Sequence, residues 1–323
     1  MPMPSTAPSP APCDRRVHSL DSHRTLMGRT RRSVLGYLSP SDVARYPIEV
    51  VMNEADYALG YAEAELRRLT TQAQLIDPIT RRFLDAAGIG KGMRVLDIGS
   101  GAGDVAFLCR EMVGATGEVV GTDVAVSSVE RAALRAKEAN TSRVSFRHGD
   151  AAELNFEQPF DAVVGRYVLQ FMPDPARSLR RIVRHLRPGG IIAFHELDWD
   201  GARSSPSSPT YDRVCNWLGR TIEAAGAQVR LGTRLASVFE DAGLPPPNLR
   251  LEAVIGSGPG ALEVAHLVTD LVETQLPTME RLGIAASSEI DHATLLDRIL
   301  SEAGRSGTLM GRSEVGAWTT KPD

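Results

Sequence analysis

Residues 94–104 decide the fold of this chain and read Arg-Val-Leu-Asp-Ile-Gly-Ser-Gly-Ala-Gly-Asp. The stretch begins as an apolar run typical of a buried strand and ends in glycines at alternate positions. The small and apolar residues 105–108 follow directly and indicate the start of a helix. The stretch therefore predicts a strand, a tight turn and a helix N-terminus, a geometry that brings backbone N–H groups close to a ligand. Glycine suits such a turn because it tolerates positive φ angles and has no Cβ atom to block the approach.

The spacing of these glycines separates two kinds of ligand site. A dinucleotide fingerprint requires the pattern G-x-G-x-x-G. Here Gly99, Gly101 and Gly103 alternate, and Asp97 precedes the first glycine by two residues. This D-x-G-x-G-x-G pattern resembles motif I of the class I S-adenosylmethionine (SAM)-dependent methyltransferases, in particular the small-molecule enzymes of the ubiquinone and menaquinone type. A glycine-rich turn without a ligand is the alternative.

Strand and helix signals alternate through the middle of the chain. Strands are predicted at 94–98, 118–123, 144–147, 160–166 and 191–196, and helices at 104–112, 127–139 and from 174 to 187. This alternation is typical of a parallel, doubly wound α/β sheet. The resemblance implies the Rossmann-like, seven-stranded methyltransferase sheet. Its last two strands, at 249–255 and over 308–318, would then form an antiparallel hairpin.

The remaining segments flank a predicted SAM-binding core at 91–260. Residues 1–41 are rich in Pro, Ser and Ala and are expected to be a disordered extension. Residues 42–90 are expected to hold a helix at 56–69 and a second helix that begins at Pro78, with Asp77 as its N-cap. Residues 306–323 are expected to form the closing strand and a tail.

Residues 261–305 are predicted to form two helices, at 261–276 and 290–303. The first of these has a wide apolar face, which must pack against another surface to be shielded from water. We interpret the segment as a helical lid over the acceptor site. A homodimer interface is the alternative and is left open.

The ligand of a doubly wound sheet binds outside the carboxyl ends of the strands. Asp97 ends the first strand and could hold the ammonium group of SAM, while Asp123 ends the second and could accept both ribose hydroxyl hydrogens. Asp150 follows the third strand and could accept from the adenine amino group. The resemblance implies that residues after the fourth strand contact the methionine end. The predicted cofactor-binding residues are Asp97, Gly99, Ser100, Gly101, Gly103, Asp123, Val124, Asp150, Ala151, Arg166 and Tyr167.

Candidate residues for the acceptor side come from the end of the fifth strand and from its flanks. His195, with Glu196 beside it, could take a proton from an acceptor hydroxyl or amine. A packed histidine with a satisfied ring is the alternative for His195. The predicted acceptor-lining residues are Tyr57, Tyr61, Trp199, Leu267 and Leu271.

Composition limits the classes of partner. The net charge of −4 over 323 residues argues against an extended nucleic-acid surface. No apolar run approaches the roughly 20 residues of a membrane span. The three cysteines, Cys13, Cys109 and Cys215, are widely scattered, which favours a reducing cytoplasm and predicts no metal site.

The sequence as a whole therefore predicts a SAM-dependent methyltransferase that acts on a small, partly apolar metabolite, as in secondary metabolism. The methylated atom, O, N or C, is left open. A protein or RNA methyltransferase is one alternative, although the N-P-P-Y signature of many amino-group enzymes is absent after the fourth strand. A protein of this fold that binds SAM without transferring the methyl group is the other.

Overall fold

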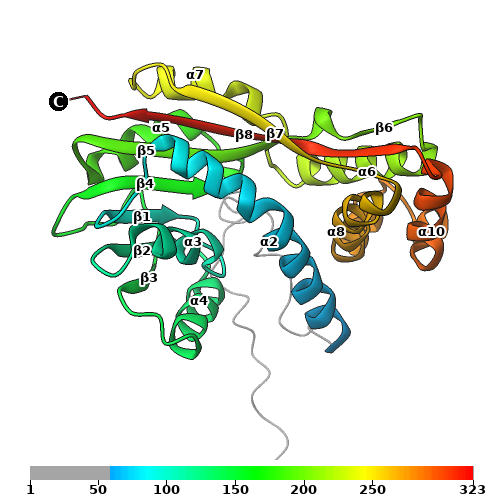
Figure 1. Cartoon of the computed structure of the whole chain (residues 1–323), viewed down its shortest axis with the longest axis horizontal. Coiled ribbons are helices and arrows are strands. Elements are labelled where there is room, and N and C mark those ends of the chain that lie inside the picture. Colours follow the sequence, from blue (N-terminus) through cyan, green and yellow to red (C-terminus); the bar gives the residue numbers. More distant parts are fainter. Residues whose placement is uncertain (1–58, 323) are drawn as a thin grey trace, which may run out of the picture. The chain divides into compact units, whose positions relative to one another are not determined.

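A mixed sheet forms the centre of the structure (Figure 1). The computed structural model describes residues 59–322 of the chain. Its strands are β1 Arg94–Ile98, β2 Glu118–Asp123, β3 Val144–His148, β4 Phe160–Arg166, β5 Leu186–Asp198, β6 Arg203–Ser205, β7 Asn248–Ser257 and β8 Thr308–Thr320. Their order is β3-β2-β1-β4-β5-β8-β6, and β7 pairs with β8. The strands β1 to β5 are parallel, and β8 is antiparallel to β5, β6 and β7. The predicted doubly wound methyltransferase sheet is confirmed, with the short β6 as an addition.

Helices cover both faces of the sheet and one of its ends. They are α2 Leu59–Ala87, α3 Asp104–Val113, α4 Val126–Glu138, α5 Pro175–Ile182, α6 Pro209–Ala224, α7 Leu235–Asp241, α8 Ala261–Arg281, α9 Ser287–Ile290 and α10 His292–Ala303. Successive side chains of a strand point to opposite faces of a sheet. Val95 accordingly packs in a cluster with residues of α2 and α3, whereas Leu96 packs with residues of α5 and α7. The core is thus divided into two layers by β1 and its neighbours.

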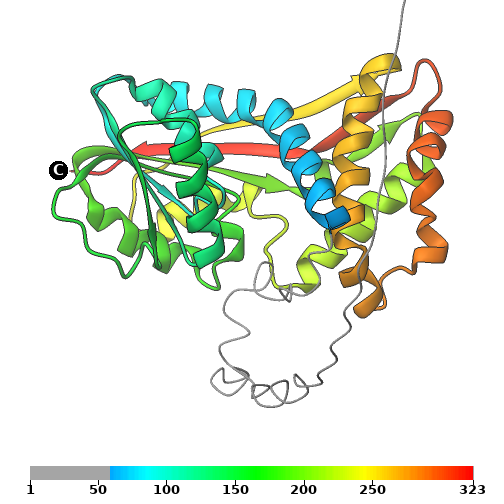
Figure 2. The same ribbon diagram turned by 90° about the horizontal axis from the view of Figure 1, so that it is seen from below.

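The helices α6, α8 and α10 gather beyond the carboxyl ends of the parallel strands (Figures 1 and 2). They share a second apolar core, in which Val264, Val268 and Val272 of α8 are buried. The helix α8 also contacts α2. The wide apolar face predicted for this helix is therefore covered mainly by elements of the same chain.

Two expected helix boundaries are wrong. The sequence predicts two helices before β1, but α2 is a single helix with Pro78 inside it. A proline inside a helix costs about 3 kcal/mol, and burial of Ile76 and Phe83 on either side of it offsets that cost. Asp77 is consequently no N-cap, and its carboxylate pairs with another element, described below. The helix expected at 290–303 is interrupted because Asp291 adopts a φ angle of 44°.

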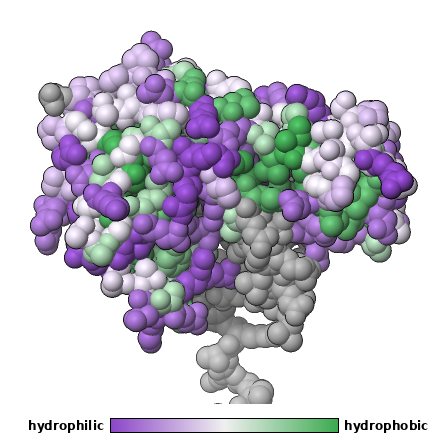
Figure 3. All heavy atoms as spheres, in the orientation of Figure 1, coloured by the Kyte–Doolittle hydropathy of each residue, from purple (hydrophilic) through white to green (hydrophobic). Residues whose placement is uncertain are grey.

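The strand β7 forms an edge that carries apolar side chains. Within the described part of the chain β7 pairs with β8 alone. Leu249, Leu251 and Ile255 are 51%, 60% and 58% exposed, and Figure 3 shows apolar atoms at the surface along the path that β7 takes in Figure 1. The homodimer that the sequence leaves open stays a prediction.

Candidate functional site

The turn between β1 and α3 holds three glycines in the left-handed region. Gly99, Gly101 and Gly103 have φ angles of 61°, 51° and 92°. Residues that carry a Cβ atom adopt such positive φ angles only at a cost in free energy. A Cβ atom on Gly99 would lie 2.4 Å from Cγ2 of Val168, so this glycine is required for packing. A Cβ atom on Gly101 would meet no described atom within 4 Å. Gly101 thus faces open space, as a residue that cradles a ligand must.

Polar side chains beside this turn are buried without partners. Asp97 is 1% exposed and Ser100 is 7% exposed. Neither oxygen of the Asp97 carboxyl group, nor the Ser100 hydroxyl, makes a well-directed hydrogen bond to any of residues 59–322, although the Ala106 N–H lies close enough to Asp97 to lower its pKa slightly. Burial raises the pKa of Asp97 to about 8, although the nearby Arg166 acts in the opposite direction. Buried polar groups are nearly always paired, so these atoms indicate a polar, cationic ligand that completes the site.

Asp123 is fixed at the carboxyl end of β2 by two backbone groups. Its Oδ2 accepts a hydrogen bond from the Gly101 N–H at 2.9 Å, and its Oδ1 accepts one from the Ala125 N–H at 2.9 Å. Each carboxylate oxygen can accept a further hydrogen bond. Asp123 therefore holds the glycine turn and can still accept from ligand hydroxyl groups. The adjoining Val124 is 38% exposed and could pack against a ligand ring.

The end of β3 supplies a further carboxylate. Asp150 Oδ1 accepts from the Ala152 N–H at 2.8 Å. The carbonyl oxygen of Ala151 is 2.8 Å from Nε2 of His185. These contacts fix the turn after β3 at the same edge of the sheet as Asp97 and Asp123.

The observations on Asp97, Ser100 and Gly101 fit SAM as the cofactor. The unpartnered Asp97 carboxylate suits an ammonium group, and the space at Gly101 allows a ligand to approach the backbone. Asp123 and Asp150 stand at successive strand ends, where a nucleoside would extend. The individual roles stay predictions.

The structure gives Arg166 and Tyr167 partners on other elements. Arg166 pairs with Asp77 of α2 at 2.6 Å and donates to Thr80 Oγ1 at 3.0 Å. The Tyr167 hydroxyl donates to Glu314 Oε2 of β8 at 2.6 Å. Both residues therefore tie α2 and β8 to the end of β4. Their predicted contact with the methionine end of SAM stays a prediction.

His195 and Glu196 are both buried, and His195 is engaged on both ring nitrogens, whereas Glu196 Oε2 has no hydrogen-bond partner among the described residues. His195 is 2% exposed, with Nδ1 at 3.0 Å from Thr80 Oγ1 and Nε2 at 2.9 Å from Glu314 Oε2. Burial lowers the pKa of His195 against the pull of Glu314, so the ring is neutral at pH 7. Glu196 Oε1 accepts from the backbone N–H groups of Val168 and Leu169, at 3.0 and 2.8 Å. These contacts favour positioning roles, and the prediction that His195 acts as a base remains untested.

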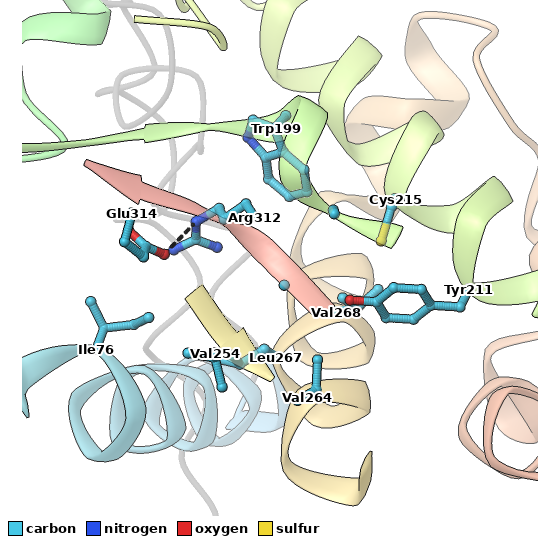
Figure 4. Close-up of a pocket in the computed structure, with 12 residues that line it drawn as sticks. Ile76, Trp199, Tyr211, Cys215, Val254, Val264, Leu267, Val268, Arg312 and Glu314 are labelled. Atoms are coloured by element: carbon cyan, nitrogen blue, oxygen red, sulfur yellow. Dashed lines mark ion pairs between the residues drawn. The ribbon is translucent and has the colours of Figure 1, made fainter. Parts of the chain in front are cut away.

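A pocket lies between the sheet end and the helices beyond it (Figure 4). Two predicted acceptor residues, Trp199 and Leu267, line it, whereas Leu271 packs in the second core. Tyr61 belongs to α2, and Tyr57 lies outside the described residues. The lining residues are Ile76, Trp199, Ala202, Tyr211, Cys215, Val254, Val264, Leu267, Val268, Gly311, Arg312 and Glu314.

Arg312 and Glu314 are the charged residues of the pocket, and the sequence analysis misses both. They stand two positions apart on β8, and this spacing places their side chains on one face of the strand. The alternating pattern of residues 308–318 could have indicated that Arg312 and Glu314 share one face of a strand. The pattern is hard to detect because charged residues interrupt the apolar run expected of a closing strand.

Three further features bear on ligands and environment. In the described residues no group of three or more His, Cys, Asp or Glu could hold a metal ion. No helix between residues 59 and 322 is long and apolar enough to cross a membrane. Cys109 and Cys215 are buried free thiols, and Cys13 lies outside the described residues.

Comparison with known proteins extends the observations on the turn and the sheet. A model of the methyltransferase domain matches residues 89–242. Nocamycin O-methyltransferase of Saccharothrix syringae is 31% identical over 215 residues, which cover 66% of this chain and 74% of that protein. Demethylmenaquinone methyltransferase of Staphylococcus aureus is 34% identical over 135 residues, which cover 42% of this chain and only 53% of that relative. A candidate methyltransferase structure from Bacillus halodurans is 17% identical, covers 75% of this chain and 98% of its own, and has a TM-score of 0.50.

The structural likeness at this low identity concerns the fold alone, and it agrees with the strand order. The sequence match to the nocamycin enzyme runs over most of that relative. Together with the glycine turn and the unpartnered Asp97, these matches settle the family. The chain belongs to the class I SAM-dependent methyltransferases, in the group related to the menaquinone and ubiquinone enzymes.

Proposed function

We propose that this protein transfers the methyl group of SAM to a small, partly apolar metabolite held in the pocket beside β8. The observation that carries the proposal is the Asp97 carboxyl group, which is buried without a partner beside an open glycine turn. SAM supplies a methyl group that is already activated on a sulfonium, so the protein has mainly to bind and orient the two reactants. The residues at the strand ends would hold SAM, and the pocket would hold the acceptor.

A short path of contacts joins the two regions. Tyr167 directly follows β4, whose carboxyl end faces the cofactor turn, and its hydroxyl group donates to Glu314. Glu314 itself lines the pocket. Because Asp97, Asp123 and Asp150 do not line the pocket, we expect substitutions at these acids to change the affinity for SAM and substitutions in the pocket wall to change the affinity for the acceptor.

The burial of α8 supports a lid rather than an interface between copies. Leu267 of α8 lines the pocket, while Val264 and Val268 line it and also pack in the second core. The helix thus forms part of the pocket wall. In this proposal residues 91–260 form the SAM-binding core and residues 261–305 form the lid.

The name of one relative supports an oxygen acceptor and a role in secondary metabolism for the proposed reaction. The name of the Saccharothrix syringae relative gives it as an O-methyltransferase of nocamycin. The buried free thiols Cys109 and Cys215 agree with a reducing cytoplasm. A SAM-binding protein without transferase activity is the second candidate function. Transfer of a labelled methyl group from SAM to a product would distinguish the methyltransferase from this second candidate.

Replacing Leu267 with Ala is expected to raise the KM of the acceptor. A lost contact between this side chain and the acceptor costs about 1–2 kcal/mol, roughly five- to thirtyfold in KM. The acceptor is first identified by mass spectrometry of a native cell extract incubated with isotopically labelled SAM, and KM and SAM affinity are then measured. SAM affinity should stay constant.

Leu271→Ala is the matched control, since Leu271 packs in the second core and not in the pocket. It should lower the melting temperature with little change in KM. Light scattering over a dilution series completes the test. If Leu267→Ala instead splits a dimer and leaves KM unchanged at fixed oligomeric state, the lid proposal is wrong.

A further inference from the structure

The outer edge of the sheet at β7 has the features of a surface for a further strand. β7 is ten residues long, and among the described residues it pairs with β8 alone (Figure 1). Leu249 and Leu251 are each more than half exposed. A single exposed apolar residue needs no explanation, but a long strand edge with apolar side chains is a template for another strand. The edge therefore fits a partner that contributes a strand of its own.

The two faces of β7 carry different side chains. Glu252 faces α2, where its Oε2 accepts from Arg82 Nε at 3.0 Å, and Arg250 lies on the same face because side chains alternate along a strand. Arg250 Nε is 3.1 Å from Glu252 Oε1 of its own strand, and the Arg250 side chain remains 46% exposed. Leu249 and Leu251 lie on the opposite face. The edge thus presents one charge of each sign on one face and two leucines on the other.

Symmetry restricts the way in which a second copy can add to this edge. A twofold axis normal to the sheet keeps each face of β7 on one face of the joined sheet. Residues opposite each other must then differ by an even number of positions, so the axis passes through a residue. An axis at Arg250 or at Glu252 would place like charges opposite each other, which is destabilising. An axis at Leu251 instead places each Arg250 opposite Glu252 of the second copy.

The other central positions for the axis fit less well. An axis at Leu249 would place Leu251 opposite Pro247, which precedes the strand and has no N–H group to donate. An axis at Ala253 would fall on the irregularity where the register with β8 shifts, between Ala253 and Ile255. Such an irregularity bends a strand and interrupts its pairing. Leu251 is therefore the centre that suits the charges, the leucines and the backbone together.

We propose that two copies of this chain join through their β7 edges, as an antiparallel pair centred on Leu251, into one sheet that runs through both subunits. Each Arg250 exchanges the Glu252 of its own strand for that of the second copy, and the two Leu251 side chains cover each other on the opposite face. The surface is distinct from residues 261–305, which the sequence suggests as an interface. The inference goes beyond the proposed function, because it requires neither SAM nor an acceptor.

Sedimentation of the full-length protein over a dilution series tests the interface. We expect a dimer at micromolar concentration that dissociates on dilution. Leu251→Lys places two like charges opposite each other at the axis and should raise the dissociation constant by at least about tenfold. Leu262→Lys is the matched control, since Leu262 is 42% exposed on α8. It should leave the dissociation constant unchanged.

A charge exchange tests the register itself. Arg250→Glu gives the edge two acids and Glu252→Arg gives it two bases, so each variant alone should be largely monomeric through repulsion between copies. An equimolar mixture should form a heterodimer, because the acidic strand of one variant lies opposite the basic strand of the other. A folding defect cannot produce this recovery. Circular dichroism and SAM affinity establish that each variant is folded.

Each outcome decides the inference. A protein that stays monomeric at every concentration, or a Leu251→Lys variant that dimerises as tightly as the original, would contradict it. A dimer that Leu262→Lys dissociates would place the interface on α8 instead. A dimer that both charge variants keep would reject the register centred on Leu251. These measurements use no methyl transfer, so the inference can fail while the proposed function stands.

Discussion

Asp97→Asn is expected to weaken SAM binding by about 3 kcal/mol, roughly a hundredfold, while the free protein becomes more stable in mildly alkaline solution. The loss of affinity follows because the carboxylate that pairs with the SAM ammonium group is removed. Titration calorimetry measures the affinity at pH 8, and thermal unfolding measures the stability of the free protein.

The gain in stability follows from the pKa of Asp97, which burial raises from 3.8 to about 8. The folded protein then holds a proton that the unfolded chain has already lost between these pH values. The contribution of Asp97 to stability is therefore full below about pH 4 and declines toward pH 8, by up to about 1.4 kcal/mol per pH unit. Asn carries no charge and escapes this decline, so the stability advantage of the variant should grow with pH.

Asp85→Asn is the control, because Asp85 is exposed on α2. It should change neither affinity nor stability. An Asp97→Asn protein that binds SAM as tightly as the original would show that this carboxylate does not contact the ligand. A simultaneous loss of stability and affinity would instead assign Asp97 to the architecture of the fold.

Alanine at Gly101 and alanine at Gly99 are expected to fail in different ways. Both glycines have positive φ angles, so each substitution costs about 1–2 kcal/mol of stability from backbone strain. At Gly99 the new Cβ atom would also overlap Val168, which adds roughly 1–3 kcal/mol. At Gly101 it would enter free space, and we expect at least about a tenfold loss of SAM affinity, or about 1.4 kcal/mol, because the methyl group occupies the ligand's place.

Chemical denaturation and SAM titration of the two variants provide the comparison. The Gly99 variant should show the larger fall in the free energy of unfolding. The Gly101 variant should lose more SAM affinity than the Gly99 variant, although it loses less stability. Equal SAM affinity for Gly101→Ala and the original protein would mean that the ligand does not approach this turn.

The sequence predicts the sheet well because its strands and turn follow local rules. Residues 94–104 specify a strand, a positive-φ turn and a helix start within eleven positions, and the structure has all three. Asp97, Asp123 and Asp150 come to one edge because parallel strands end on the same side of a sheet. This part of the candidate site could be located before any coordinates were known.

Other features depend on contacts between distant segments and carry a weaker local signal. The course of α2 through Pro78 depends on burial against Tyr167 and Val254, which lie far along the chain, and this burial outweighs the local preference of proline for a helix start. Arg312 and Glu314 acquire their role only because β8 runs between β5 and β7 and meets Tyr167 and His195. The engagement of His195 on both ring nitrogens likewise follows from the packing of α2 and β8, and the sequence alone does not decide between a free ring that acts as a base and a packed ring.

The binding of SAM to the full-length protein tests the central claim most directly. Titration calorimetry near pH 7.4, in buffers of different ionisation enthalpy, measures both the affinity and the protons exchanged. Because the pKa of Asp97 is raised to about 8, we expect micromolar binding of SAM with release of a fraction of a proton as the ammonium group pairs with the carboxylate. The absence of both heat and thermal stabilisation, with SAM and with its demethylated product, would contradict the account.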